Sequence, residues 1–98
     1  MSDIELLFEW DDDKGKANLK KHKVGFAEAK TVFNDPLLIT FLDDEHSKEE
    51  DRLISIGTSS SSRILLAVHT ERKENVIRII SCRKATASER KRYEESEN

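Results

Sequence analysis

Short apolar clusters alternate with charged segments along the 98 residues of the chain. Segments rich in β-branched and aromatic residues predict strands, and apolar residues at helical spacing predict helices. The predicted order is β-α-α-β-β-β-β-α, with strands at residues 4–10, 37–42, 52–58, 63–69 and 76–83, helices at residues 14–21 and 26–33, and a last helix from a cap at Thr86 or Ser88 through Glu95. An acidic loop at residues 43–51, four serines at residues 59–62 and a polar turn at residues 71–75 separate the last four strands.

The short polar links between those four strands suit antiparallel neighbours. We therefore expect an α+β fold with an N-terminal strand and two helices, then a mainly antiparallel sheet of about four to five strands, and a C-terminal helix. A chain of this length buries too little surface for two cores, so residues 1–98 are expected to form a single domain.

No membrane anchor or secretory signal is expected from the sequence. The longest uninterrupted apolar run covers residues 64–68, far short of the ~20 residues that span a bilayer. Cys82 is the only cysteine, so an internal disulfide is excluded and a reducing, cytoplasmic location fits best.

Charge changes sign along the chain, although the net charge is only −3, a value that argues against a general nucleic-acid coat. Residues 14–23 and residues 52–84 each carry a formal charge of +5, and acidic segments lie before and between them. Solvated faces with local ion pairs are one explanation. Two basic blocks that converge in space would instead make an anion site.

Arginines at strand positions are the first candidates for such a site. Strict alternation in residues 76–83 puts Arg78 and Cys82 on one face and Arg83 on the other. A mid-strand guanidinium is costly to bury unpaired, so Arg78 must reach solvent, a carboxylate or a ligand. Two interpretations stay open: an ion pair with the acidic loop at residues 43–51, or a phosphate site in which Arg63, Arg78 and Arg83 offer bidentate donors.

A second candidate is the basic cluster Lys20-Lys21-His22-Lys23 at the end of the first predicted helix. An imidazole beside ammonium groups can act as general acid or base on a phosphodiester that the lysines hold, although an inert histidine is the commoner case. The three histidines share no spacing typical of metal ligands, so no metal site is expected. Cys82 is interpreted as a small core residue.

Together these residues resemble the BrnT toxins of bacterial type II toxin–antitoxin systems over nearly the whole chain. The most specific part is Arg78-Ile79-Ile80-Ser81 followed by Arg83-Lys84-Ala85-Thr86. The other matching segments are Phe8-Glu9-Trp10-Asp11, Asn18 with Lys21-His22, Val24-Gly25-Phe26, Ala29, Val32-Phe33-Asn34-Asp35-Pro36, Glu50 with Arg52, Ile56-Gly57, Arg63-Ile64-Leu65, Thr70-Glu71-Arg72, Glu89-Arg90 and Tyr93-Glu94.

One departure from the family pattern concerns Lys23, which stands where the family usually has glycine. A glycine would let the first helix end in a left-handed turn. The lysine either accepts that strain or ends the helix differently.

The resemblance implies a small RelE-like fold and an endoribonuclease that cleaves RNA and inhibits growth. It also implies a BrnA-like ribbon-helix-helix antitoxin as partner, with operator DNA bound only through the toxin–antitoxin complex. The expected mechanism is metal-independent attack of an RNA 2′-hydroxyl on its own phosphate, with no cofactor. The rival class is a non-catalytic binding module whose arginines dock nucleic acid or an acidic protein.

The candidate site residues fall into three groups. The catalytic group is Lys21, His22, Glu50, Arg52, Arg63, Arg78 and Arg83, the RNA-binding group is Trp10, Lys20 and Lys84, and Arg90 and Tyr93 are expected to contact the antitoxin. His22 or Glu50 is the candidate base or acid. We expect His22, Arg63 and Arg78 to line one concavity on the open face of the sheet, where the two basic blocks would meet.

Overall fold

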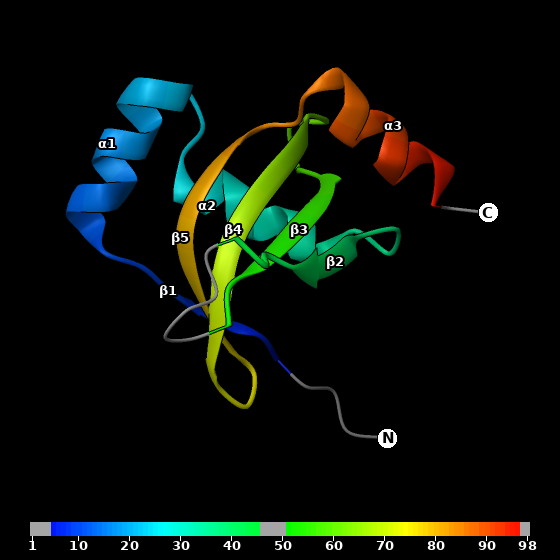
Figure 1. Ribbon diagram of the computed structural model, residues 1–98. Helices are drawn as coiled ribbons and strands as arrows, with labels where there is room; N and C mark the ends of the chain where they lie inside the picture. The colour runs from blue at the N-terminus through cyan, green and yellow to red at the C-terminus, as the bar shows by residue number, and fades with distance from the viewer. Residues whose placement is uncertain (1–4, 46–50, 97–98) are drawn as a thin grey trace.

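The computed structural model describes residues 5–45 and 51–96, and its elements follow the predicted order (Figure 1). The strands are β1 (Leu7–Glu9), β2 (Ile39–Leu42), β3 (Leu53–Thr58), β4 (Ile64–Lys73) and β5 (Val76–Lys84), and the helices are α1 (Asp12–His22), α2 (Phe26–Ala29), the 3₁₀ helix η1 (Lys30–Asn34) and α3 (Ala87–Glu95). The second predicted helix is therefore split, because its last turn tightens to 3₁₀ geometry before Asp35.

The polar turn predicted at residues 71–75 is shorter than expected. β4 continues to Lys73, and a two-residue turn at Glu74 and Asn75 leads into β5. Asn75 has a φ of 62°, a left-handed conformation that asparagine tolerates better than most residues. Residues 71–73 are thus part of a strand despite their polarity, because they pair with β5.

The sheet has the strand order β1-β5-β4-β3-β2 among the described residues. β1 runs parallel to β5, and the other neighbouring pairs are antiparallel. The predicted α+β fold with a mainly antiparallel sheet is confirmed.

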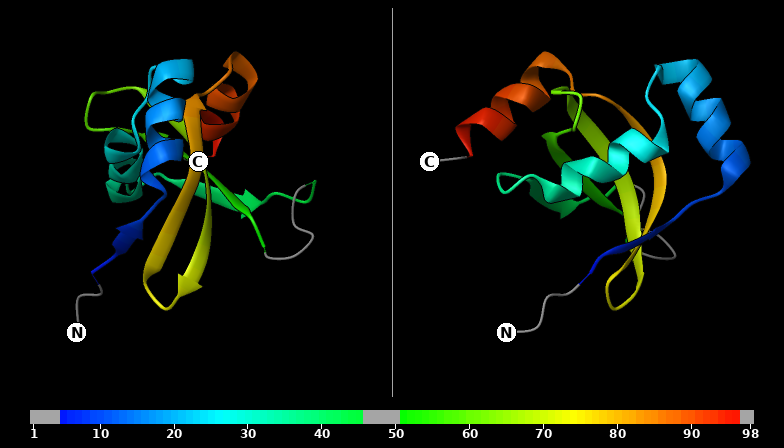
Figure 2. Two further views of the ribbon diagram at one scale, coloured as in Figure 1. Left: turned by 90° about the vertical axis from the view of Figure 1, so that its left-hand side faces the viewer. Right: turned by 180° about the vertical axis from the view of Figure 1, so that it is seen from behind.

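One face of the sheet is covered by α1, α2 and η1, which lie on the opposite side of β5 from α3 (Figure 2). Apolar residues at helical spacing in α2 and η1 meet alternate residues of β4 and β5, as an amphipathic helix on a sheet requires. This covered face holds the larger apolar cluster: Val24, Phe26, Ala29, Val32, Leu65, Ala67, Ile77, Ile79 and Cys82.

The opposite face, called the open face here, is packed by α3 among the described elements. Its smaller cluster is centred on Ile56, Leu66 and Tyr93. The Tyr93 hydroxyl donates to Asp35 and hydrogen-bonds Thr58 Oγ1 at 3.0 Å. Tyr93 therefore fixes α3 through polar as well as apolar contacts.

The N-terminal cap of α3 is Thr86 rather than Ser88. Its hydroxyl accepts from the Glu89 N–H at 3.2 Å, and the Glu89 carboxylate accepts from the Thr86 N–H at 2.8 Å. This reciprocal arrangement is a capping box, which satisfies two backbone donors that a helix start otherwise leaves open.

A β-bulge in β5 overturns the strict alternation predicted for residues 76–83. His69 pairs with Ile79 and Val68 with Ser81, so Ile80 is the extra residue. The bulge puts Cys82 on the covered face, in one cluster with Ile79. Arg78 and Cys82 thus lie on opposite faces, contrary to the prediction.

Lys23 ends α1 in the left-handed conformation, with a φ of 62° and its N–H bonded to the Leu19 carbonyl. The lysine therefore accepts the strain that a glycine would avoid. None of the helices described is both long and apolar enough to cross a membrane.

Candidate active site on the open face

A groove of about 420 Å³ lies on the open face of the sheet and is called the open-face groove below. Its floor is apolar and comes from the central strands, with Phe41, Ile54, Ile56, Leu66 and Val68. Its polar lining comes from the end of α1, the chain after β2, the end of β5, and α3, with His22, Asp43, Glu45, Ser81, Arg83, Glu89 and Arg92. A polar rim around an apolar floor is typical of a small-ligand or nucleotide site.

His22 reaches this groove because α1 packs on β5. It is the last residue of α1 and is half-buried, beside Ser81 and Arg83 in the groove lining. An imidazole so placed can bind a ligand in the groove and exchange a proton with it. His22 and Arg83 are therefore two of the predicted catalytic residues that the fold does bring together.

Arg83 is held by Glu89 from α3. Two parallel hydrogen bonds join the groups, at 2.7 Å from Nη1 to Oε1 and 2.9 Å from Nη2 to Oε2. The guanidinium lowers the pKa of Glu89 to about 2, mainly through these hydrogen bonds. Nη1 also donates to the Lys84 carbonyl at 3.2 Å. Because a guanidinium carries five N–H groups, donors remain for an anion in the groove.

Arg92 is a cation of this groove that the sequence analysis missed. Its guanidinium carbon lies 3.9 Å from the centre of the Phe41 ring, a cation–π contact. The usable signal was helical spacing, because Arg92 is three residues after Glu89 and one before the inward-facing Tyr93.

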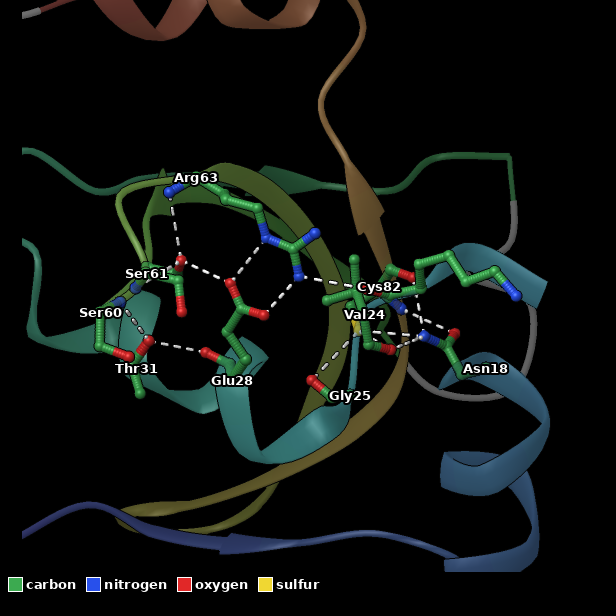
Figure 3. Close-up of polar contacts among 11 residues, drawn as sticks. Asn18, Val24, Gly25, Glu28, Thr31, Ser60, Ser61, Arg63 and Cys82 are labelled. Carbon is green, nitrogen blue, oxygen red and sulfur yellow. Dashed lines mark hydrogen bonds and ion pairs between the residues drawn. The ribbon is translucent and has the colours of Figure 1, made fainter. Parts of the chain in front are cut away.

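Arg63 does not line the open-face groove and instead packs against α2 on the covered side (Figure 3). Its Nε donates to Glu28 at 3.0 Å, its Nη2 donates to the other Glu28 oxygen, and Nη2 also reaches the Lys23 carbonyl at 3.2 Å. Hydrogen bonding by Arg63 holds the pKa of Glu28 below its ordinary value. Ser59 donates to the same carboxylate at 2.7 Å, which ties the serine turn to α2.

Arg78 is on the open face but also outside the groove lining. Its Nη1 bonds Glu9 of β1 at 2.9 Å, and Arg72 Nε lies 4.0 Å from the same Glu9 oxygen. The expectation that His22, Arg63 and Arg78 share one concavity is therefore wrong. Arg63, Arg78 and Arg83 belong to three separate ion pairs, each with a carboxylate from a different element.

The remaining predicted residues lie in several places. Trp10 packs edge-on against Phe26 on the covered side, with ring centres 6.0 Å apart. Lys20 and Lys21 are exposed near the end of α1. Lys84 and Arg90 line a different hollow of about 260 Å³ that also touches Arg63.

Tyr93 and Arg52 gain little support for a direct role. Tyr93 is only 5% exposed and faces the sheet, so α3 does not present it to a partner in this arrangement. Arg52 is half-buried just before β3, where its carbonyl accepts from the Asp43 N–H at 2.7 Å. Glu50, the alternative base or acid, lies outside the described residues, as does His46 of the acidic loop.

His69, unlike His22, is buried in the core. It is 2% exposed on the covered side, and burial lowers its pKa to about 4. Its Nε2 hydrogen-bonds Ser55 Oγ at 2.7 Å, and its ring packs edge-on against Phe33. Nothing in residues 5–45 and 51–96 hydrogen-bonds its Nδ1. His69 is a neutral core residue at pH 7.

Cys82 is confirmed as a core residue. It is 1% exposed, and burial raises the pKa of its thiol to about 11, so the neighbouring basic residues do not activate it. In the part of the chain that the structure describes, no three His, Cys, Asp or Glu side chains are grouped so that they could hold a metal ion.

These features define a small α+β protein with a groove on one face of its sheet, lined by an imidazole, two guanidinium groups and three carboxylates. A model of the family described as "Ribonuclease toxin, BrnT, of type II toxin-antitoxin system" matches residues 10–89. The chain therefore belongs to the BrnT toxin family and is a ribonuclease toxin of a type II toxin–antitoxin system. Membership implies RNA as substrate and an antitoxin as partner.

Comparison with solved structures agrees on the fold. The chain is similar to the ribonuclease toxin BrnT of Brucella abortus, solved at 1.1 Å, with a TM-score of 0.61 and 22% identity over 86% of this chain and 99% of that one. No curated protein sequence gave a significant match.

Proposed function

We propose that the open-face groove is the centre at which this ribonuclease cuts RNA, with His22 and Arg83 as its principal groups. The observation that carries the proposal is that these two residues, from the ends of α1 and β5, line one groove although they lie 61 positions apart in the sequence. Arg92 adds a second guanidinium to the same lining. Cations and a proton-exchanging group around one cavity are what phosphodiester cleavage requires.

The proposed reaction is an internal transfer at phosphorus. The RNA 2′-oxygen forms a bond to the adjacent phosphorus, the bond from phosphorus to the 5′-oxygen breaks, and the products are a 2′,3′-cyclic phosphate and a 5′-hydroxyl. One proton leaves the 2′-hydroxyl and one joins the 5′-oxygen. His22 carries out one of these transfers, and Arg83 stabilises the extra charge on the phosphate oxygens.

This chemistry needs no metal ion, and we propose that none takes part. The experiment is cleavage of single-stranded RNA by the purified full chain in EDTA, with analysis of the new 3′ ends. Cyclic phosphate ends formed at the same rate with and without EDTA are expected. Activity that appears only after magnesium is added would contradict the proposal. RNA binding without any cleavage would favour the rival binding module.

The partner is proposed to be a BrnA-like ribbon-helix-helix antitoxin that binds operator DNA as part of the complex, in the cytoplasm. The family implies an antitoxin, and the exposed side of α3, which includes Arg90, supports a surface for it. Deleting residues 86–98 is a poor test, because Tyr93 supports the open-face cluster. Arg90→Glu should weaken antitoxin binding in calorimetry while the melting temperature of the toxin stays unchanged. Unaltered affinity would remove α3 from the proposed interface.

A further inference from the structure

Asn18 is a buried polar residue of α1 that the reaction proposed above does not use. It is 8% exposed, and its side chain makes four hydrogen bonds. Its Nδ2 donates to the carbonyl of Val24 at 2.8 Å, to the carbonyl of Cys82 at 2.9 Å and to the sulfur of Cys82 at 3.1 Å. Its Oδ1 accepts from the Cys82 N–H at 3.1 Å.

These contacts connect two parts of the chain around one amide (Figure 3). Cys82 belongs to β5, and Val24 belongs to the link between α1 and α2. β1 pairs only with residues 76–78 of β5 in the described structure, so it does not reach Cys82. The Asn18 side chain hydrogen-bonds both the backbone N–H and the carbonyl of Cys82, which a neighbouring strand would otherwise pair.

His22 lies between Asn18 and Val24 in the sequence. It follows Asn18 by four residues, so the two side chains are on the same side of α1, and it precedes Val24 by two. In the groove it lies beside Ser81 and Arg83, the residues on either side of Cys82. The Asn18 amide thus holds α1 to the stretch of β5 that His22 faces.

The turn after His22 is constrained further. Lys23 is held in the left-handed conformation, and its carbonyl accepts from Arg63 Nη2 at 3.2 Å. A lysine stays in that conformation only where its surroundings determine it, because the left-handed region costs an ordinary side chain about 1 kcal/mol or more. The backbone on both sides of His22 is therefore fixed by contacts.

We propose that Asn18 is a positioning residue for RNA cleavage, which holds the His22 imidazole at the open-face groove beside Arg83. The inference rests on the proposed function of that groove. Catalytic groups lose rate steeply when they are misplaced by about 1 Å, so a residue that sets the distance from α1 to β5 controls turnover more than affinity.

The test uses Asn18→Asp in the full chain, since aspartate has the same shape and still accepts from the Cys82 N–H but cannot donate to the two carbonyls. A fall in kcat of about 10-fold or more with KM within about 3-fold is expected, because a displaced general acid or base loses part of its ~100-fold contribution. Val32→Ala, a buried substitution on the covered face, is the matched control for lost stability alone, and it should keep the wild-type kcat.

A double-mutant cycle with His22→Ala shows whether Asn18 acts through His22. If it does, Asn18→Asp with His22→Ala is no slower than His22→Ala alone, whereas independent effects multiply. Multiplied effects, or a folded Asn18→Asp with wild-type kcat, overturn the proposal.

Two further outcomes keep the inference separate from the function it rests on. His22→Ala with wild-type activity overturns the proposed role of His22 and that of Asn18 with it, whereas an inactive His22→Ala beside a fully active Asn18→Asp overturns the role of Asn18 alone. If circular dichroism shows Asn18→Asp unfolded, Asn18→Gln replaces it, with the amide on a longer stem. If neither folds, Asn18 serves the fold and the positioning role is overturned.

Discussion

The two faces of the sheet place histidine and arginine side chains in different surroundings. On the covered face, burial keeps His69 neutral, and the Arg63 guanidinium is paired with Glu28 of α2 and donates to the Lys23 carbonyl. On the open face, His22 is half-buried and lines, together with Arg83, a groove of about 420 Å³. Under the proposed function, the covered-face groups stabilise the fold, whereas His22 and Arg83 contact the RNA. On this proposal, position in the fold and not residue type separates structural from functional basic residues.

The largest expected effect is on cleavage by Arg83→Ala. Loss of one donor to the charged transition state typically costs about 100-fold in rate, and a loss of this size in kcat is expected for the folded variant. Glu89→Gln is the control, because it breaks the same ion pair, keeps the guanidinium and leaves a side chain suited to the capping box. Equal losses in both variants would make Arg83 a structural residue like Arg63.

His69 should affect stability rather than cleavage. Because its folded pKa is about 4, below the ordinary 6.5, only the unfolded chain takes up a proton between these values, so stability is full above pH 6.5 and falls as the pH drops toward 4. In the wild type, His69 should lower the free energy of unfolding by about 2–3 kcal/mol between pH 7 and pH 4.5. His69→Gln should lack this decrease, as measured by urea unfolding at the two pH values. Its cleavage rate at pH 7 should match the wild type. A large loss of cleavage would mean that catalysis depends on the covered face.

The smallest expected effect is at the end of α1. Lys23→Gly should raise the free energy of unfolding by about 0.5–1 kcal/mol, because glycine adopts the left-handed conformation without strain. Lys20→Gly, within the same helix, should lower it by a similar amount. Destabilisation by both substitutions would show that the contacts of the Lys23 side chain outweigh its backbone strain.

Element order was predictable because it depends on local patterns. The alternation of apolar residues, Asn34-Asp35-Pro36 and the Thr86 capping box all act within a few residues. The full length of β4 was not predictable from local patterns, because its polar end is held by pairing with β5. The bulge at Ile80 was not predictable either. One extra residue moves every later side chain of the strand to the other face, but the hydrophobic pattern of the sequence changes too little to indicate it.

The candidate site was predicted only in part for a similar reason. His22 and Arg83 were identified, but the partners of Arg63 and Arg78 come from distant elements, Glu28 and Glu9. Which carboxylate an arginine meets is decided by packing, and residue spacing carries no signal for it. Arg92 was missed because its only signal, the three-residue spacing from Glu89, is shared by many pairs on a highly charged helix.

The most direct test of the open-face groove as the ribonuclease centre is the single-turnover cleavage rate of His22→Ala, measured in EDTA on the same RNA as the wild type. Removal of a general acid or base should slow cleavage by about 100-fold, with an unchanged melting temperature because His22 is only half-buried at a helix end. A rate within about 3-fold of the wild type would contradict the assignment of the groove.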